Sequence, residues 1–238
     1  MNYTWATATH VGLHRDQNED SVFPLDDGSG SGPVVIAVAD GMGGHAAGEV
    51  ASRIAIDAAT SGIPGDLDMQ ARSQRANDAV LAAVADDPSI AGMGTTLTMA
   101  VLTPEGTMHV AHIGDSRLYV KRGETLHLVT VDHTWVMDLV ARGQISPADA
   151  GTHPRRHLLS RVVGMESVHA DVIEFPLETG DRILFCSDGL SGMVPDGAIA
   201  LILGEAETPS GAAWALIEAA NNGGGVDNTT VAVVDVSA

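Results

Sequence analysis

The 238-residue chain has a single cysteine, Cys186, and only 3% aromatic residues. One cysteine excludes an internal disulfide bond, and a reducing cytoplasm is the simplest compartment for such a chain. Because aromatic residues are so few, the core must be built from Val, Ile, Leu and Ala. A chain of this length can bury a sizeable core, and we expect one domain that spans residues 1–238.

Basic residues and long apolar runs are also scarce. The chain carries 12 Lys and Arg against 31 Asp and Glu, a formal charge of −19, which argues against nucleic acid or an anionic membrane surface as the main partner. It has no run of about 18 apolar residues that would predict a transmembrane helix. The stretch MNYTWATATHVG lacks the basic and apolar regions of a signal peptide. These absences predict a cytoplasmic protein without a membrane segment.

The most informative stretch is residues 34–44, VVIAVADGMGG. Its first six residues are apolar and predict a buried strand, which ends at Asp40. A buried strand does not normally end on a carboxylate that lacks a partner, and the glycines that follow allow a ligand to approach the backbone closely. Asp40 therefore has two interpretations: a ligand for a hard cation, or the cap of the next helix after an Asp-Gly turn.

The rest of the chain alternates between two periodicities. Helical spacing occurs at 48–61, 69–87, 134–142, 196–204 and 209–222. Strand-like runs occur at 1–12, 168–176, 181–187 and 229–236, and an antiparallel meander is expected over 96–103, 108–113, 117–121 and 125–130. The glycine-rich stretch 26–32 is expected to be a flexible surface loop, and residues 143–161 to be irregular and either functional or mobile. This order predicts an α+β fold, a four-layer α-β-β-α sandwich in which helices flank two mainly antiparallel sheets.

Acidic residues recur where the predicted strands end. Asp40, Asp188 and Asp227 each adjoin an apolar strand and a glycine or asparagine, Asp115 follows the same rule, and Glu19-Asp20 lies just beyond the first strand. On one edge of a sandwich these carboxylates would repel one another unless cations lay between them. All-oxygen ligands are typical of Mg²⁺ or Mn²⁺ sites.

Other catalytic arrangements are excluded by what is missing. The close pair His109 and His112 falls on opposite faces of a strand, so we interpret both as structural rather than as zinc ligands. Gly192 stands where a cysteine-dependent phosphatase would need Arg, six residues after Cys186. No histidine follows His169, which argues against a serine hydrolase, and the chain lacks a P-loop and a nucleophile elbow.

Taken together, the motifs resemble those of a known family, the metal-dependent type 2C (PPM) protein serine/threonine phosphatases. The resemblance spans essentially the whole chain and is strongest to the catalytic domain of bacterial members. The motifs that carry it are Arg15…Asn18-Glu19-Asp20, Asp40-Gly41-Met42-Gly43-Gly44, Gly94-Thr95-Thr96, Gly114-Asp115-Ser116-Arg117, Ser187-Asp188-Gly189 and Asp227-Asn228-x-Thr230.

The resemblance implies two Mn²⁺ or Mg²⁺ ions at one end of a β-sandwich, with a third ion in the bacterial relatives. The implied ligands are Asp40 as the bridge between the two ions, Asp188 and Asp227 in the first site, the Gly41 carbonyl in the second, Glu19 and Asp20 directly or through water, and Asp115 with Asp188 at the third ion. Arg15 is implied to bind the substrate phosphate as a planar guanidinium. Residues 143–161 correspond to a mobile flap beside the site.

The implied reaction is hydrolysis of phosphoserine and phosphothreonine monoesters by a water that bridges the two ions, without a covalent intermediate. The implied partners are phosphorylated proteins and a cognate serine/threonine kinase, and the chain is expected to be a monomer. A non-catalytic metal-binding or phosphopeptide-binding module and a small-molecule phosphatase are the alternatives. The complete set of carboxylates favours an enzyme over a degenerate binding module.

One position departs from many eukaryotic relatives, which have His where this chain has Met42. A methionine cannot donate a proton. The leaving group would then take its proton from a metal-bound water, which we favour, or from His45.

Overall fold

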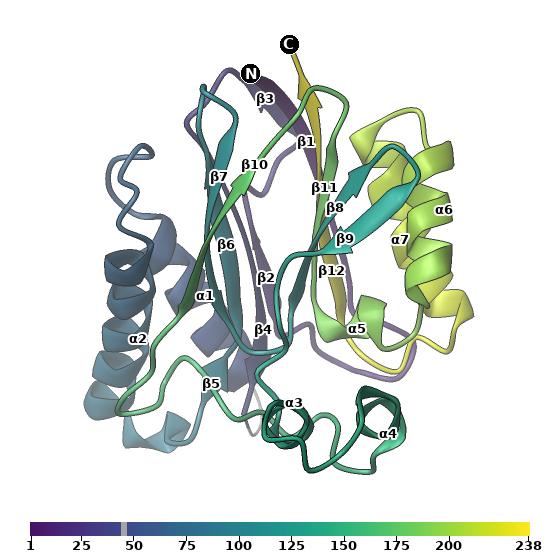
Figure 1. Cartoon of the computed structure of the whole chain (residues 1–238). Helices are drawn as coiled ribbons and strands as arrows, with labels where there is room; N and C mark the ends of the chain where they lie inside the picture. Colours follow the sequence, from purple (N-terminus) through teal and green to yellow (C-terminus); the bar gives the residue numbers. More distant parts are fainter. Residues whose placement is uncertain (44–46) are drawn as a thin grey trace.

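The computed structural model describes residues 1–43 and 47–238. Two β-sheets face each other, helices α1 and α2 cover the outer face of one sheet, and helices α6 and α7 cover the other (Figure 1). The predicted four-layer α-β-β-α sandwich is therefore confirmed. Gly44 and His45 lie outside the described residues.

The first sheet contains, in spatial order, β3 (Gly28–Gly30), β1 (Asn2–His10), β12 (Thr229–Ser237), β11 (Arg182–Cys186), β8 (Arg117–Arg122) and β9 (Thr125–Leu128). The second sheet contains β10 (Asp171–Pro176), β7 (Thr107–Ile113), β6 (Leu97–Leu102), β4 (Val34–Met42) and β2 (Asp20–Phe23), and the short β5 (Gly94–Thr95) pairs with the end of β4. All pairings between these strands are antiparallel.

The helices lie close to the predicted ranges. The outer layers are α1 (Ala47–Thr60) with α2 (Met69–Asp86), and α6 (Asp196–Glu205) with α7 (Pro209–Asn222). A one-turn helix, α5 (Asp188–Ser191), follows β11, and a 3-10 turn (Pro88–Ile90) follows α2. Helices α3 (Trp135–Ala141) and α4 (Pro147–Thr152) lie together across one end of the sandwich (Figure 1).

The central strands are apolar throughout because both of their faces are covered. Along β4, alternate side chains point to opposite sides: Val34, Ile36 and Val38 lie between the two sheets, whereas Val35, Ala37 and Ala39 pack under α1 and α2. The helix side of this contact is also rich in alanine, including Ala51, Ala55 and Ala59 of α1. Small side chains on both surfaces allow the helix to lie close to the sheet, which suits a chain with few aromatic residues.

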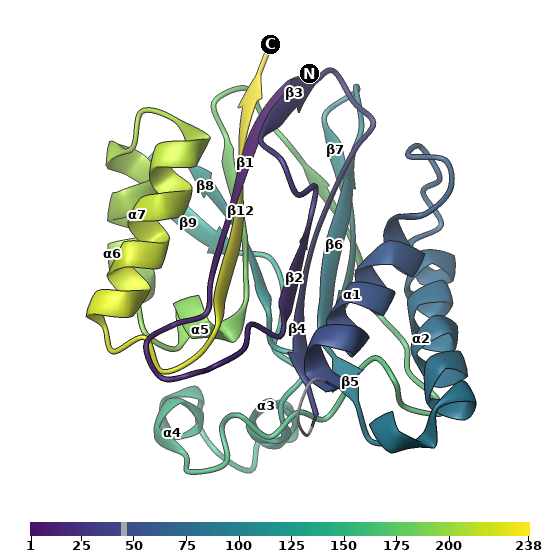
Figure 2. The ribbon, with the colours of Figure 1, turned by 180° about the vertical axis from the view of Figure 1, so that it is seen from behind.

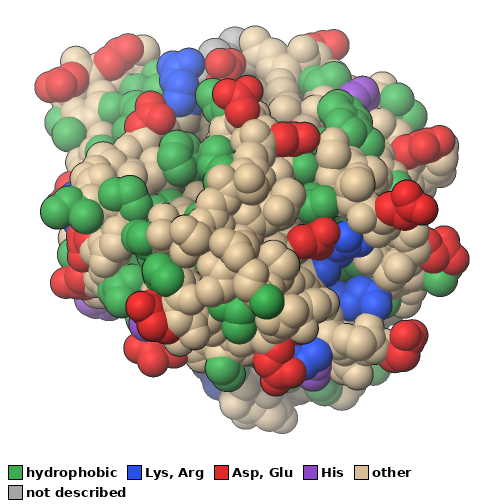
Figure 3. Space-filling model, turned by 90° about the horizontal axis from the view of Figure 1, so that it is seen from above, with side chains coloured by type: hydrophobic (Ala, Val, Ile, Leu, Met, Phe, Trp, Pro, Cys, Tyr) green, Lys and Arg blue, Asp and Glu red, His purple; other side chains and the backbone are tan. Residues whose placement is uncertain are grey.

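The two ends of the sandwich differ. Both termini lie at one end, and α3, α4 and the last residues of β4 lie at the other (Figures 1 and 2). Seen from the terminal end, acidic side chains are spread over the surface and basic ones gather mainly on one side (Figure 3). The end away from the termini is where the predicted acidic residues meet.

The predicted meander is wrong in one respect. Strands β6 and β7 belong to the second sheet, whereas β8 and β9 belong to the first, so the chain changes sheets at residues 114–116. Gly114 has a φ of +106° and a Cβ there would lie 2.5 Å from Thr96, so only glycine fits this crossing. The crossing carries Asp115 to the end of the sandwich.

Two segments are more regular than predicted. Part of the expected loop 26–32 is the edge strand β3, where Gly28 lies against the ring of Trp5 and a Cβ would come within 2.5 Å of it. Within residues 143–161, α4 begins at a capping box in which Ser146 and Asp149 bond each other's backbone N–H groups. Strand β4 also continues past Asp40 to Met42 because Gly41 and Met42 pair with β5.

Among residues 1–43 and 47–238, no helix combines sufficient length and apolar character to cross a bilayer.

Arg72 of α2 offers a test of the α1–α2 connection. Its side chain is buried and donates four hydrogen bonds, of 2.7–3.2 Å, to the carbonyls of Ala59, Ile63, Pro64 and Asp66. Arg72→Met leaves these carbonyls without their donor, so we expect the free energy of unfolding to fall by about 2–3 kcal/mol in urea titrations. The half-exposed Arg75→Met is the control and should change it by less than about 0.5 kcal/mol; equal effects would contradict this account.

Candidate metal centre

Five aspartates converge at the end of the sandwich away from the termini. Asp40 of β4 lies opposite Asp20 of β2 in the strand register, Asp188 begins α5, and Asp227 directly precedes Asn228 and β12. Asp40, Asp115, Asp188 and Asp227 line a cleft of about 430 Å³ together with Arg15, Glu19 and Gly41. The structure therefore brings the predicted site residues together from segments that are far apart in the sequence.

The backbone around Asp40 is fixed by two threonines. The Asp40 N–H donates to Thr96 Oγ1 at 2.9 Å, and its carbonyl accepts from the Thr96 N–H at 2.9 Å and from Thr95 Oγ1 at 2.8 Å. Gly41 follows in a crowded position, where a Cβ would lie 2.1 Å from the Gly48 carbonyl and 2.5 Å from the Glu19 carbonyl. Any larger residue at 41 would push α1 and β2 away from the site.

Asp20 is held from one side only. Ser187 Oγ donates to Asp20 Oδ2 at 2.7 Å and itself accepts from the Thr230 N–H at 3.0 Å. The other oxygen, Oδ1, is buried and has no hydrogen-bond partner among the described residues. A buried carboxylate oxygen without a donor is costly, so this atom is available to a cation or a water.

Asn228, the residue before β12, holds the loop of residues 11–19 in place. This loop carries Arg15 and Glu19. Asn228 Oδ1 accepts from the Glu19 N–H at 2.8 Å, and Asn228 Nδ2 donates to the carbonyls of Val11 and Gln17 at 2.9 and 2.8 Å. The side chain is buried. Asn228 occurs in the Asp-Asn-x-Thr motif of the sequence, but its bonding to a loop more than 200 residues away could not be deduced from that motif.

Burial and mutual repulsion raise the proton affinity of these acids. Burial, more than the charges of its neighbours, raises the pKa of Asp20 to about 7 and that of Asp115 to about 8. The pKa of Asp40 is raised well above its usual value by burial and then by Asp20 and Asp188, and that of Asp188 is raised by burial and then by Asp227. The cluster is short of positive charge, and bound cations would supply it.

Arg15 and Glu19 lie at the rim of the same cleft. Arg15 Nη2 is 2.8 Å from Asp227 Oδ2, and half of the Arg15 side chain is exposed. Glu19 lies against Gly48 at the start of α1, and burial raises its pKa despite the opposing effect of Arg15. The guanidinium thus points to the acid cluster and is open to solvent.

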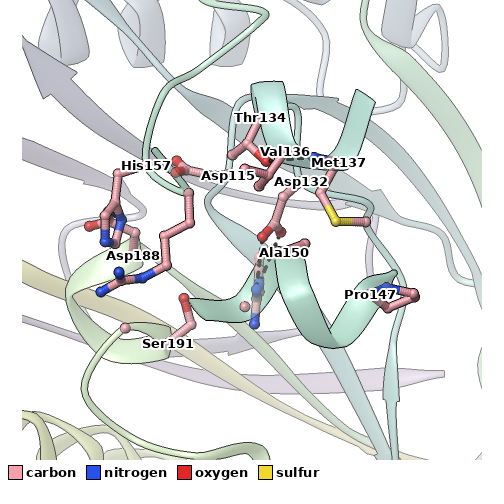
Figure 4. Close-up of a pocket in the computed structure, with 14 residues that line it drawn as sticks. Asp115, Asp132, Thr134, Val136, Met137, Pro147, Ala150, His157, Asp188 and Ser191 are labelled. Carbon is pink, nitrogen blue, oxygen red and sulfur yellow. Dashed lines mark hydrogen bonds and ion pairs between the residues drawn. The ribbon is translucent and has the colours of Figure 1, made fainter. Parts of the chain in front are cut away.

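A second cleft, of about 340 Å³, adjoins the first and shares Asp115, His157 and Asp188 with it (Figure 4). Residues of the short helices α3 and α4 line this cleft, and Asp132, which also lines it, binds Arg117 through two hydrogen bonds of 2.9 and 2.7 Å. His157 Nδ1 lies 3.8 Å from Asp188 Oδ2. The sequence marked residues 143–161 as functional but gave no role to His157.

Across residues 1–43 and 47–238, no three His, Cys, Asp or Glu side chains come close enough to enclose an ion by themselves. The free donors are carboxylate oxygens and the Gly41 carbonyl. An ion here would complete its coordination with water, as Mg²⁺ usually does, and these oxygen donors do not suit a soft metal.

Comparison with known proteins was made with the sequence and with the fold. The family model described as protein phosphatase 2C matches residues 14–200. The serine/threonine protein phosphatase PstP of Mycobacterium tuberculosis is 42% identical over 98% of this chain, which spans only 45% of the length of that relative. The serine/threonine phosphatase stp of Listeria monocytogenes is 38% identical over 95% of this chain and 93% of its own length.

Solved structures agree with this result. The crystal structure of the Mycobacterium tuberculosis phosphatase PstP superimposes with a TM-score of 0.91 at 40% identity, with all of both chains covered. The catalytic domain of PstP in complex with two manganese ions superimposes with a TM-score of 0.88 at 39% identity, again with full coverage of both chains.

The raised pKa values predict how the metal-free protein responds to pH. The folded state keeps protons that the unfolded state releases near pH 4, so stability should fall as the pH rises above about 4, and the decline should end once the pH has passed about 7 and 8. Each extra proton held by the folded state contributes about 1.4 kcal/mol per pH unit to this slope. Thermal unfolding between pH 5 and 8.5 should show the decline, and Mn²⁺ should reverse it.

A matched pair of variants tests whether ionisation of the buried acids causes this decline of stability with pH. Asp115→Asn should make the decline shallower, because one of the acids that cause it no longer ionises, whereas the exposed Asp57→Asn on α1 should leave it unchanged. A metal-free protein whose stability rises over this pH range would contradict the assignment.

Proposed function

Because this chain belongs to the protein phosphatase 2C family, we propose that it is a metal-dependent protein serine/threonine phosphatase. The observation that carries the proposal is the cleft in which four aspartates lie beside the half-exposed guanidinium of Arg15. We also infer that residues 1–238 form one catalytic domain, in which residues 143–161 act as a flap, since the two sheets and their helices share continuous cores.

The residues fit a pair of Mn²⁺ or Mg²⁺ ions. Support comes from the unpartnered Asp20 Oδ1, from the raised pKa values and from the all-oxygen donor set. The proposed ligands are Asp40 between the ions, Asp188 and Asp227 in the first site, the Gly41 carbonyl in the second, Asp20 and Glu19 directly or through water, and Asp115 with Asp188 at a third ion. When bound, such ions lower the pKa of water and offset charge on the phosphoryl group.

Arg15 is proposed to bind the phosphoryl oxygens. Its planar fork matches two of them, and its present partner Asp227 holds it at the mouth of the cleft. Thr95 and Thr96 keep the backbone of Asp40 still while charge develops nearby, so the electrostatic field does not have to reorganise during the reaction.

His157 is proposed to donate the proton that the leaving serine or threonine oxygen needs. It is the imidazole that lines both clefts among the described residues, and its Nδ1 lies 3.8 Å from the Asp188 carboxylate. Met42 lines the first cleft as well but carries no transferable proton.

The proposed substrates are phosphorylated proteins, and the reaction class that supplies them is protein phosphorylation by a serine/threonine kinase. We further propose that the chain acts as a monomer in the cytoplasm. A phosphopeptide-binding module would keep the same cleft, and a turnover measurement separates it from an enzyme.

Phosphate release from a phosphothreonine peptide tests the function. After chelator treatment we expect no release, and added Mn²⁺ should restore it. Asp40→Ala and Asp188→Ala should each lower kcat by at least about 100-fold, because each removes a charged ligand. A control, Asp57→Ala, should retain full turnover. A wild-type protein that binds Mn²⁺ but releases no phosphate would instead support the binding module.

The leaving group distinguishes the role of His157. His157→Gln should lower kcat on the phosphothreonine peptide about 100-fold, since an alkoxide leaves poorly without a proton. It should lower kcat on p-nitrophenyl phosphate less than about threefold, because nitrophenolate needs no proton. His153→Gln, in the same segment, is the control. Equal losses of His157→Gln on both substrates would contradict proton donation.

A further inference from the structure

The flap segment, residues 143–161, returns to the sandwich beside His133. The Trp135 N–H donates to the Leu158 carbonyl at 2.8 Å, and the Ser160 N–H donates to the His133 carbonyl at 2.9 Å. Two residues beyond the segment, Val163 exchanges hydrogen bonds of 2.9 and 3.1 Å with Thr95. The C-terminal end of the flap segment is thus attached to both sides of the acid cluster.

His133 fixes the turn that carries Asp115. The His133 N–H donates to the Gly114 carbonyl at 2.7 Å, and the Gly114 N–H donates to His133 Nδ1 at 3.1 Å. Because Nδ1 accepts a backbone N–H, the neutral ring carries its proton on Nε2. The ring is 5% exposed, and burial lowers its pKa, which favours this neutral form.

Asp171, the first residue of β10, joins this ring to the flap segment. His133 Nε2 lies 3.1 Å from Asp171 Oδ2, and Arg161 Nη1 lies 2.5 Å from Asp171 Oδ1. Arg161 Nη1 is also 3.1 Å from His133 Nε2, but both atoms are donors, so they share the carboxylate rather than bonding each other. One acid therefore holds the last residue of the flap segment and the histidine under Asp115.

We propose that Asp171 and His133 are positioning residues that couple the flap segment to the turn of Asp115. The contacts run from Arg161 to Asp171, from Asp171 to His133 Nε2, and from His133 Nδ1 to Gly114. When the flap segment leaves, Asp171 loses Arg161, and the ring that fixes Gly114 loses the support of its orienting acid. By linkage, a cation bound at Asp115 favours the attached flap by the same factor. This inference rests on the proposed role of Asp115 as a metal ligand.

The turn has little freedom to compensate. Gly114 is trapped against Thr96, Ser116 Oγ lies 2.7 Å from Thr96 Oγ1, and Asp115 is 8% exposed. Thr96 and His133 therefore support this turn together, and a change in the His133 ring removes the support that reaches the flap segment.

Limited trypsin digestion of the metal-free chain tests the first link. Asp171→Asn keeps an acceptor for Nε2 but removes the charge that holds Arg161, so cleavage within residues 143–161 should accelerate roughly five- to thirtyfold. Glu174→Gln is the matched control, since Glu174 lies on the same strand and pairs with His109 at 3.5 Å. Its cleavage rate should equal that of the wild type. An unchanged rate in Asp171→Asn would overturn the coupling.

Mn²⁺ titration calorimetry tests the second link. Asp115→Asn should remove one Mn²⁺-binding site, and Asp171→Asn should lower the Mn²⁺ affinity of that same site by about fivefold or more. In the Asp115→Asn background, Asp171→Asn should have no further effect on Mn²⁺ binding. Additive effects in the double variant would show that Asp171 acts elsewhere and would overturn the relay. Mn²⁺ binding that Asp115→Asn does not change would overturn it too, together with that part of the proposed function.

His133 itself provides a geometric control. His133→Asn keeps an acceptor at the Nδ1 position for Gly114, whereas His133→Gln keeps a donor at the Nε2 position for Asp171. The relay needs both contacts, so both variants should bind Mn²⁺ more weakly at the site that Asp115→Asn removes. Each variant is titrated at a temperature below its own unfolding midpoint, so that it is folded during the measurement. Digestion and calorimetry do not require turnover. A wild-type protein without phosphatase activity would therefore refute the proposed function, while these two measurements would still test the coupling.

Discussion

Repulsion among carboxylates at one end of the sandwich is the constraint on which the rest of this structure depends. Asp20, Asp40, Asp115 and Asp188 are crowded together and partly removed from water, which costs free energy in the absence of cations. They stay in place because their backbones have other partners: Thr95 and Thr96 hold Asp40. The free-energy cost of this crowding is offset by the burial of apolar side chains between the two sheets and under the helices on either side.

Much of the architecture could be predicted because it follows from local periodicity. The apolar run before Asp40 and the helical spacing of alanines around Ala51 and Ala55 depend only on neighbours along the chain. Local periodicity does not show to which sheet β8 and β9 belong, because their side chains suit either one. The sheet is determined at Gly114, whose positive φ directs the chain from the second sheet to the first.

The site was predictable to the extent that its chemistry is carried by residue type. Acids beside glycines at strand ends indicated a cation site and identified Asp40, Asp188 and Asp227 as candidates, and the structure brings these three residues into one cleft. The contacts of the supporting residues could not be predicted, because they are tertiary. Asn228 stands in a recognised motif and His133 in none, and only the fold shows that Asn228 bonds to the carbonyls of Val11 and Gln17 and His133 to the turn at Gly114.

The contact between Arg15 and Asp227 has a consequence for the order in which ligands arrive. The guanidinium forms an ion pair with a carboxylate that is proposed to bind a cation. A cation at Asp227 would release Arg15 for an incoming phosphoryl group, and a phosphoryl group on Arg15 would free Asp227 for the cation. The two ligands would then bind with positive heterotropic cooperativity, so the affinity measured for either one depends on the concentration of the other.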